Sequence, residues 1–203
     1  RGYLVLQPQF RGSTGFGEEF RKAGIHQWGF LMQDDVTDGV KAMIDQHLAD
    51  PHRVCIAGGS YGGYAALAGA AFTPDLYACA ISINGVFDLP LLQVYEEKHS
   101  GELSDTVLYW REHIGSSQDP RLAEKSPGRH AASVNAHVLL LQSTDDTVVP
   151  VEQADAMAAS LRLANKQVKL VKMAGDDHWL SNAATRVQVL QEMDIFLQSN
   201  LPN

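Results

Sequence analysis

Ser60 lies in a glycine-rich turn suited to present a serine hydroxyl as a nucleophile. Residues 58–63 read GGSYGG and fit the pattern G-x-S-x-G. The turn follows the apolar run 54–57 and opens the small-residue run 64–69, which is the strand, turn and helix that a nucleophile elbow requires. Glycines are needed because side chains there would collide with the adjoining strand and helix. We therefore predict that Ser60 is the nucleophile and that the backbone N–H of Tyr61 faces the developing oxyanion.

A serine hydroxyl needs an adjacent base, and the chain has eight histidines. His178 follows the last predicted strand in a polar turn, before the final helix, and such loops hold the sites of parallel sheets. The histidines at positions 47, 52, 99, 113, 130 and 137 are expected on the surface or in loops, and His26 is left open. Histidines and carboxylates share no metal-ligand spacing, so we predict no metal and no other cofactor.

The acid that orients His178 is expected in the turn after the apolar run 138–142. This turn holds two neighbouring aspartates, Asp145 and Asp146. The chain order serine, acid, histidine is that of the α/β-hydrolases. Either carboxylate could accept the Nδ1 proton of the imidazole, and spacing alone does not choose between them.

The elements that must position these residues alternate between strand and helix. Five apolar runs predict buried parallel strands, at residues 3–7, 53–57, 78–84, 138–142 and 168–172. Three sets of apolar residues recur at helical spacing between them. The sets are Val36, Val40, Met43, Ile44 and Leu48; Ala154, Met157, Ala158 and Leu161; and Val187, Leu190, Met193 and Leu197. We predict an α/β fold of the α/β-hydrolase type, with helices on both faces of a mostly parallel sheet. Residues 88–134 break the rhythm and predict a functional loop or small lid.

Composition narrows the range of functions. The 203 residues suit one domain with a real core, and a net charge of −8 argues against nucleic acid as a partner. No apolar run approaches the length of a membrane span, so no membrane partner is predicted. Cys55 and Cys79 lie in apolar runs, which favours packed free thiols, a reducing compartment and hence a cytoplasmic location.

Together these residues resemble the prolyl oligopeptidase family of serine peptidases, especially its acylaminoacyl-peptidase and dipeptidyl-peptidase-like branch. The match covers nearly the whole chain. It is carried by residues 10–17 (FRGSTGFG), 28–29 (WG), 34–36 (DDV), 58–64 (GGSYGGY) and 126–127 (SP). In this family the acid lies four residues before a proline, here Pro150, which selects Asp146 as the triad aspartate. The 32 residues from Asp146 to His178 also suit the family.

The resemblance also implies the whole protein's organisation and its substrate pocket. Residues 1–203 would be the catalytic domain, preceded by an N-terminal β-propeller, the first strands of the sheet and the loop with the second oxyanion donor. The chain begins in mid-strand without a methionine, so we expect such a truncation. By the same correspondence Val86 and Tyr109 would line the S1 pocket, and Val148 and Val149 would add apolar surface. Gln142-Ser143 stands where the family usually has His-Gly. Val148 stands where acylaminoacyl peptidases often have arginine, which argues against acylaminoacyl specificity.

The leading hypothesis is a serine peptidase that cleaves short peptides after an apolar or proline residue, and in any case an uncharged one, through an acyl-enzyme on Ser60. A carboxylesterase is the first alternative, because the same triad and fold serve both reactions. The second is a fragment that is inert as it stands, because a single oxyanion donor and an uncovered sheet edge would weaken catalysis. The uncovered edge also favours association, so a homo-oligomer is among the expected partners, besides the peptide substrate.

Overall fold

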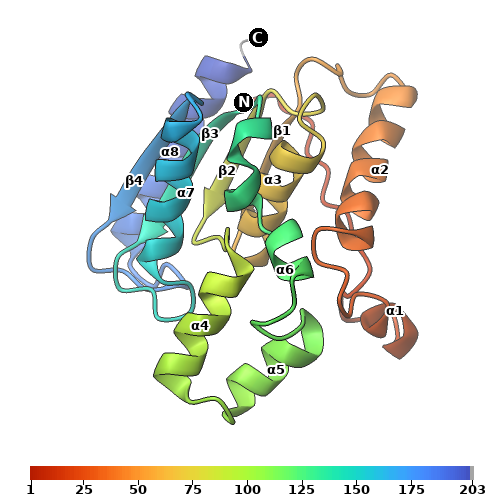
Figure 1. Ribbon diagram of the computed structural model, residues 1–203. Coiled ribbons are helices and arrows are strands. Elements are labelled where there is room, and N and C mark those ends of the chain that lie inside the picture. The colour runs from red at the N-terminus through yellow and green to blue at the C-terminus, as the bar shows by residue number, and fades with distance from the viewer. Residues whose placement is uncertain (202–203) are drawn as a thin grey trace.

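The fold is built on a four-stranded parallel sheet (Figure 1). The computed structural model describes residues 1–201. Within them the strands are β1 (Cys55–Gly59), β2 (Cys79–Ile83), β3 (His137–Ser143) and β4 (Val168–Met173), in the spatial order β1-β2-β3-β4. Four of the five predicted strands are therefore present, and because all four are parallel, their carboxyl ends lie along one edge of the sheet.

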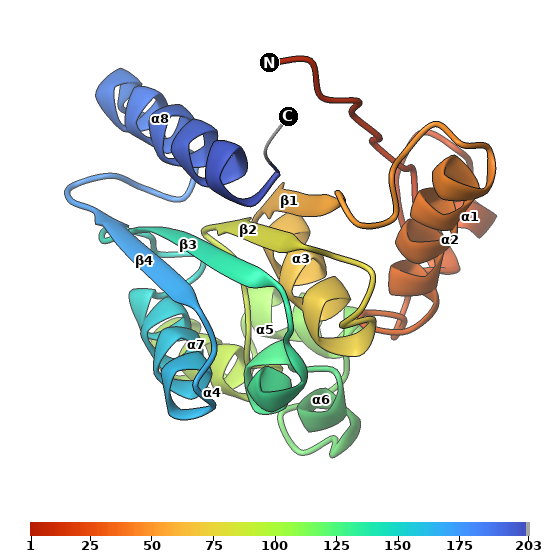
Figure 2. The ribbon, with the colours of Figure 1, turned by 90° about the horizontal axis from the view of Figure 1, so that it is seen from above.

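Alternate residues of the central strands supply two separate cores. Val138 and Leu140 of β3 face a cluster made with the helices α3 (Tyr61–Phe72) and α7 (Val151–Leu163). Leu139 and Leu141 face the other way, into a cluster made with α8 (Ala183–Asn200). Figure 2 shows α8 on one side of the sheet and α3 and α7 on the other. The side-chain period of two along a strand explains this division, and the predicted α/β-hydrolase class with helices on both faces is confirmed.

The remaining helices lie along the flanks. α1 (Glu18–Lys22) and α2 (Leu31–Asp45) precede the sheet, and α2 packs on α3. Residues 88–134, predicted to be a loop or lid, form α4 (Leu89–Ser100), α5 (Asp105–His113), α6 (Arg121–Glu124) and the 3-10 helix η1 (Pro127–Ser133). Asp88 and Ser104 begin α4 and α5 by accepting hydrogen bonds from backbone N–H groups of the first turn. Figure 1 shows α4 and α5 projecting from the body of the domain.

Three of the predicted elements need correction. Residues 3–7, all within the described part of the chain, form no strand, because no neighbouring strand among residues 1–201 pairs with them. Leu48 lies beyond the end of α2 and is exposed. On α8, the predicted core residues Met193 and Leu197 do face the core, whereas Val187 and Leu190 are exposed. Val189 and Phe196, which were not in the predicted set, take their place in the core. The apolar residues of α8 itself are spread over much of its circumference, so their spacing alone does not identify the buried face.

The prediction of two free thiols is wrong. Cys55 and Cys79 occupy directly opposite positions on β1 and β2 and form a disulfide, with their Cα atoms 4.6 Å apart. Two apolar runs in sequence do not reveal that the two residues will be cross-strand neighbours, which is why composition misled here. The cytoplasmic location stays a prediction, without the cysteine argument that supported it. No helix within residues 1–201 combines the length and the apolar character needed to cross a bilayer.

Candidate active site

Ser60 occupies the turn between the end of β1 and the start of α3. Its backbone has φ 54° and ψ −118°, a conformation that costs a non-glycine residue free energy and is typical of strained functional turns. The Ser60 N–H donates to the carbonyl oxygen of Ile83 on β2 at 2.9 Å, which holds the turn against the sheet. Tyr61 is the first residue of α3, so its N–H has no partner four residues earlier in the helix and is available to an anion.

Two of the glycines around Ser60 are required by close packing. A Cβ atom on Gly58 would lie 2.4 Å from the backbone of Gly62, and one on Gly63 would lie 2.5 Å from the Ser82 hydroxyl. A Cβ atom on Gly62 would meet nothing within 4 Å. The strand and helix can therefore approach closely enough to form the elbow only because positions 58 and 63 lack side chains.

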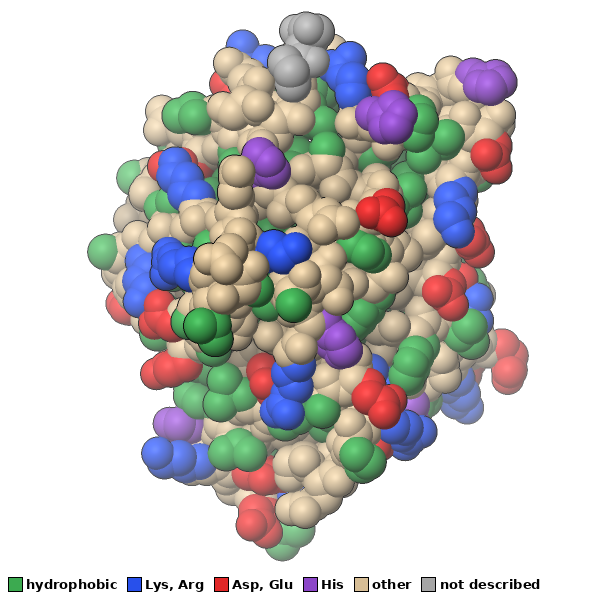
Figure 3. All heavy atoms as spheres, turned by 45° about the horizontal axis from the view of Figure 1, so that its top comes forward, with side chains coloured by type: hydrophobic (Ala, Val, Ile, Leu, Met, Phe, Trp, Pro, Cys, Tyr) green, Lys and Arg blue, Asp and Glu red, His purple; other side chains and the backbone are tan. Residues whose placement is uncertain are grey.

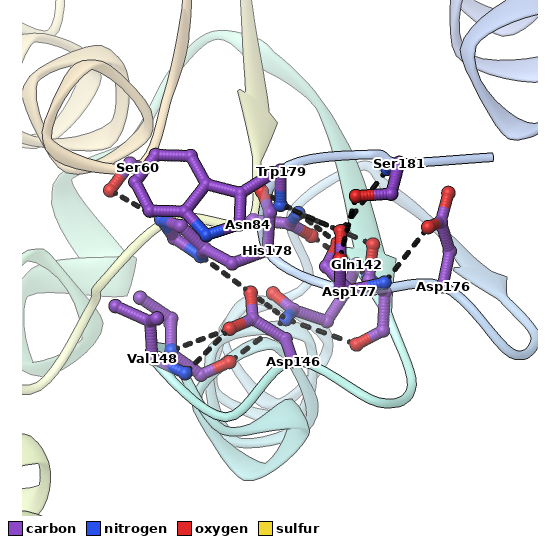
Figure 4. Close-up of polar contacts among 12 residues, drawn as sticks. Ser60, Asn84, Gln142, Asp146, Val148, Asp176, Asp177, His178, Trp179 and Ser181 are labelled. Carbon is purple, nitrogen blue, oxygen red and sulfur yellow. Dashed lines mark hydrogen bonds and ion pairs between the residues drawn. The ribbon is translucent and has the colours of Figure 1, made fainter. Parts of the chain in front are cut away.

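The structure brings Ser60, His178 and Asp146 into one hydrogen-bonded chain (Figure 4). The Nε2 atom of His178 lies 2.9 Å from the Ser60 Oγ, and its Nδ1 atom lies 2.8 Å from the Asp146 Oδ2. The Asp146 Oδ1 accepts hydrogen bonds from the N–H groups of Val148 and Val149 at 2.9 and 2.8 Å. Because both carboxylate oxygens are bound, the side chain is fixed and can hold the imidazole with Nε2 toward the serine.

The other candidate acid lies away from the imidazole. Asp145 is exposed, and its carboxylate accepts a hydrogen bond from the Thr144 hydroxyl at 3.0 Å. Its backbone N–H donates to the carbonyl oxygen of Asp176, so it ties the acid turn to the histidine turn. The geometry thus puts Asp146 in contact with His178, and Asp145 outside the hydrogen-bonded chain.

Two buried amide side chains, to which the sequence analysis gave no role in the site, hold the segments that carry His178 and Asp146. The Asn84 side chain, 2% exposed, accepts from the N–H of Ser143 at 2.8 Å and donates to the carbonyl oxygen of His178 at 3.1 Å. Gln142 is fully buried, and its Nε2 donates to the Val149 carbonyl oxygen at 3.1 Å and lies 3.4 Å from the Asp146 Oδ2. In the sequence Gln142 stands out only as a departure from the family pattern, and its contact with Asp146 follows from its burial near the end of β3.

An apolar cluster lies beside the nucleophile turn. Val86 and Val149 are each 2% exposed, and Val148, Tyr61 and Trp110 pack against the same cluster. The Tyr61 ring also contacts Trp28, with ring centroids 4.5 Å apart, and burial raises the pKa of its hydroxyl well above the usual value. Three of the four predicted S1 residues thus meet in one apolar region next to Ser60.

Tyr109, the fourth predicted S1 residue, lies at the surface of α5. Its side chain is 53% exposed and stacks on His113, with the ring centroids 3.9 Å apart. The next residue, Trp110, packs its indole into the apolar cluster and against Trp28. The neighbouring aromatic of the same helix therefore supplies the apolar contact, and the S1 role of Tyr109 stays a prediction.

The charges on the surface are mixed. Figure 3 shows lysine and arginine side chains interspersed with acidic ones on the face it presents. Among residues 1–201, no group of three or more His, Cys, Asp and Glu side chains has the arrangement of a metal site.

Comparison with known proteins adds the family. A sequence model of the prolyl oligopeptidase family of peptidases matches residues 1–203. The chain belongs to this family. The resemblance drawn from its motifs is therefore confirmed, and the family is one of serine-type peptidases.

The relatives of this prolyl oligopeptidase family member are much longer proteins. Dipeptidyl aminopeptidase BIII of Pseudoxanthomonas mexicana is 35% identical over 189 residues, which cover 88% of this chain and 26% of that protein. A puromycin-hydrolyzing peptidase of Mycobacterium tuberculosis superposes with a TM-score of 0.86 at 33% identity, over 95% of this chain and 29% of the other. The acylaminoacyl peptidase of Pyrococcus horikoshii gives a TM-score of 0.83 at 25% identity, over 95% and 31%. The chain thus spans under a third of each of these relatives.

Proposed function

We propose that this domain carries the catalytic centre of a serine peptidase that cleaves short peptides through an acyl-enzyme on Ser60. The observation that carries the proposal is the continuous hydrogen-bonded chain from the Ser60 hydroxyl through His178 to the buried Asp146 carboxylate. Family membership supports it, because the relatives named above are peptidases.

The proposed acylation step follows from the positions of these groups. The Ser60 Oγ attacks the substrate carbonyl carbon while the His178 Nε2 takes its proton, and Asp146 holds the imidazole in the required orientation. The N–H of Tyr61 donates to the oxyanion of the tetrahedral intermediate. When the C–N bond breaks, His178 gives the proton to the leaving amine. Water then attacks the acyl-enzyme while His178 takes a proton from this water. The C–O bond to Ser60 breaks, His178 returns the proton to the Ser60 Oγ, and the acid product is released.

The proposed substrates are short peptides with an uncharged residue before the scissile bond. The cluster of Val86, Val148 and Val149 beside Ser60 offers no counter-charge, and an unpaired charge there would lose its hydration. The names of the relatives include a dipeptidyl aminopeptidase and an acylaminoacyl peptidase, which differ in how they treat the substrate's amino terminus. We therefore define the proposed substrates by the uncharged residue before the scissile bond, and not by their amino-terminal group.

Labelling with a fluorophosphonate probe tests the nucleophile directly. The wild-type protein should be labelled, Ser60→Ala should not, and Asp146→Asn and His178→Ala should react orders of magnitude more slowly. Ser133→Ala is a matched control, because Ser133 is exposed and lies in η1. Persistent labelling of Ser60→Ala would overturn the assignment. The substrate class is tested by cleavage rates for peptides that differ only in the residue before the scissile bond. If peptides with lysine, arginine or glutamate at that position were cleaved fastest, the proposed substrate class alone would be overturned.

A further inference from the structure

Trp179, the residue after His178, is a large apolar side chain that the fold leaves in solvent. It is 77% exposed, although exposed indoles are uncommon on protein surfaces. Its ring stands edge-on to the imidazole of His178, with the centroids 5.1 Å apart and the planes at 89°. Figure 4 shows the indole next to the His178 ring at the end of the triad that carries Ser60, with Val148 toward the Asp146 end.

The backbone on both sides of Trp179 is held firmly. The Asp177 Oδ1 accepts from the N–H groups of Trp179 and Ser181 at 3.0 and 3.1 Å, and its Oδ2 accepts from the Ser181 hydroxyl at 2.7 Å. Leu180 has φ 53° and packs its side chain into the cluster under α8. The Asp177 carboxylate is thus occupied by local hydrogen bonds. The indole is the exposed group of this turn, and the backbone that carries it is fixed.

The chemistry of the proposed reaction says which part of a substrate meets this indole. His178 protonates the leaving nitrogen, so that nitrogen must come within hydrogen-bond reach of Nε2, about 2.6–3.2 Å. The acyl part has its own apolar surface on the Val86 and Val149 side of Ser60. A group that flanks the imidazole, and does not belong to that cluster, therefore faces the leaving part of the substrate.

The geometry points to Trp179 as a specificity residue that binds an aromatic or apolar side chain on the leaving amine, the P1′ residue of a peptide. This inference rests on the proposed function, because it uses His178 as the proton donor to the leaving group. The indole gives such a side chain a flat apolar surface, and aromatic rings pack well edge-to-face or offset on indole. Burial of the exposed indole on binding would favour aromatic leaving groups over small ones.

Acyl transfer to added amines tests this site without a change of acyl group. The acyl-enzyme is formed from a p-nitrophenyl ester with an uncharged acyl residue, and phenylalaninamide or glycinamide competes with water for it. The products give the partition ratio for each amine. The wild-type protein should favour phenylalaninamide. In Trp179→Ala the preference for phenylalaninamide over glycinamide should fall by about tenfold, equivalent to about 1.4 kcal/mol. Trp179→Phe should keep most of the preference.

The controls separate this inference from its alternatives. Leu163→Ala removes another exposed apolar side chain, 87% exposed at the end of α7, and should leave the preference as in wild type. If Trp179→Ala slows transfer to both amines and to water equally, Trp179 positions His178 and the inference is wrong. An unchanged preference in Trp179→Ala, with a normal Ser60-dependent burst, also overturns the inference alone. Absence of any Ser60-dependent burst in wild type would overturn the proposed function and this inference with it.

Discussion

The side chain of Asn84 and the main chain of His178 are joined by a hydrogen bond of 3.1 Å, although 94 residues separate them in the chain. Asn84 follows the end of β2 with φ 49°, and its amide oxygen accepts from the Ser143 N–H at the end of β3. One buried amide therefore fixes the histidine loop to two strand ends. Ser60 is also bound to β2, through the Ile83 carbonyl oxygen, so Ser60 and His178 are both held relative to this strand.

Asn84→Asp should reduce activity without preventing folding. Aspartate tolerates the positive φ, but an ionised carboxylate cannot donate to the His178 carbonyl oxygen. Loss of a buried hydrogen bond with an unpaired acceptor costs about 1–3 kcal/mol. We expect kcat/KM and the rate of fluorophosphonate labelling to fall roughly tenfold to a hundredfold.

Asn165→Asp is the matched control for Asn84. Asn165 also has a positive φ, 57°, but it is exposed after the end of α7. Its substitution should change neither the labelling rate nor the melting temperature appreciably. Equal activity losses in the two variants would show that the negative charge, and not the lost contact with His178, is responsible.

Asp145→Asn and Asp146→Asn should differ sharply. The Asp146 carboxylate lies 2.8 Å from the His178 Nδ1, whereas Asp145 is exposed and bound to Thr144. Asparagine at 146 can present a donor to Nδ1 and favour the wrong tautomer, which in a comparable triad costs on the order of 10⁴-fold in kcat. We expect a loss of that order for Asp146→Asn and less than about threefold for Asp145→Asn, measured as kcat on one peptide substrate. The reverse order would exchange the two roles.

Sequence was enough to predict the parts of the candidate site that local patterns encode. Ser60 is marked by a strand, a glycine turn and a small-residue helix within a few residues of one another, and His178 by its place after the last strand. The choice of Asp146 over Asp145 needed the family's spacing from Pro150, because both aspartates occupy one turn. The strands were likewise predicted correctly wherever an apolar run has a partner strand in the fold.

What sequence did not reveal depends on contacts between distant segments. Asn84 followed by Gly85 has the composition of a turn, and its bond to His178 exists only once β2 and the histidine loop are adjacent. The direct pairing of Cys55 with Cys79 arises in the same way, from the register of β1 against β2. The exposed Trp179 could not be told from a core tryptophan, since exposure is a property of the folded chain.

The Arg11–Asp35 pair should make stability depend on pH in the acid range. The Asp35 carboxylate binds the Arg11 guanidinium at 2.6 and 2.8 Å and the Arg11 N–H at 2.9 Å, which ties the loop before α1 to α2. These hydrogen bonds from Arg11 lower the pKa of Asp35 below its ordinary value of 3.8. Its stabilisation is therefore complete above pH 3.8 and is lost as the pH falls through the lowered value in the folded protein.

Asp35→Asn should consequently lower the melting temperature at pH 7, and the difference from wild type should shrink as the pH falls below 3.8. Asp38→Asn on the same helix is the control, because Asp38 is exposed and makes no side-chain hydrogen bond within the described chain. Melting curves at pH 7, 5, 4 and 3 measure both differences. A deficit for Asp35→Asn that is as large at the lowest pH as at neutrality would contradict this account.

Three glycine-to-alanine variants should show which glycines around Ser60 are required by close packing and which are not. Gly58→Ala puts a Cβ atom 2.4 Å from the Gly62 backbone, and Gly63→Ala puts one 2.8 Å from the Gly85 Cα, so in each case backbone must move. Overpacking of this kind costs about 1–3 kcal/mol, or roughly 2–12 °C in melting temperature for a chain of this size.

Gly62→Ala is the control: the added Cβ atom would meet nothing within 4 Å, and alanine is a better helix former than glycine near the start of α3. Its melting temperature should stay the same or rise, although Gly62 is the glycine that completes the G-x-S-x-G pattern. If Gly62→Ala is as unstable as Gly58→Ala, the close approach of strand and helix is not the reason for these glycines.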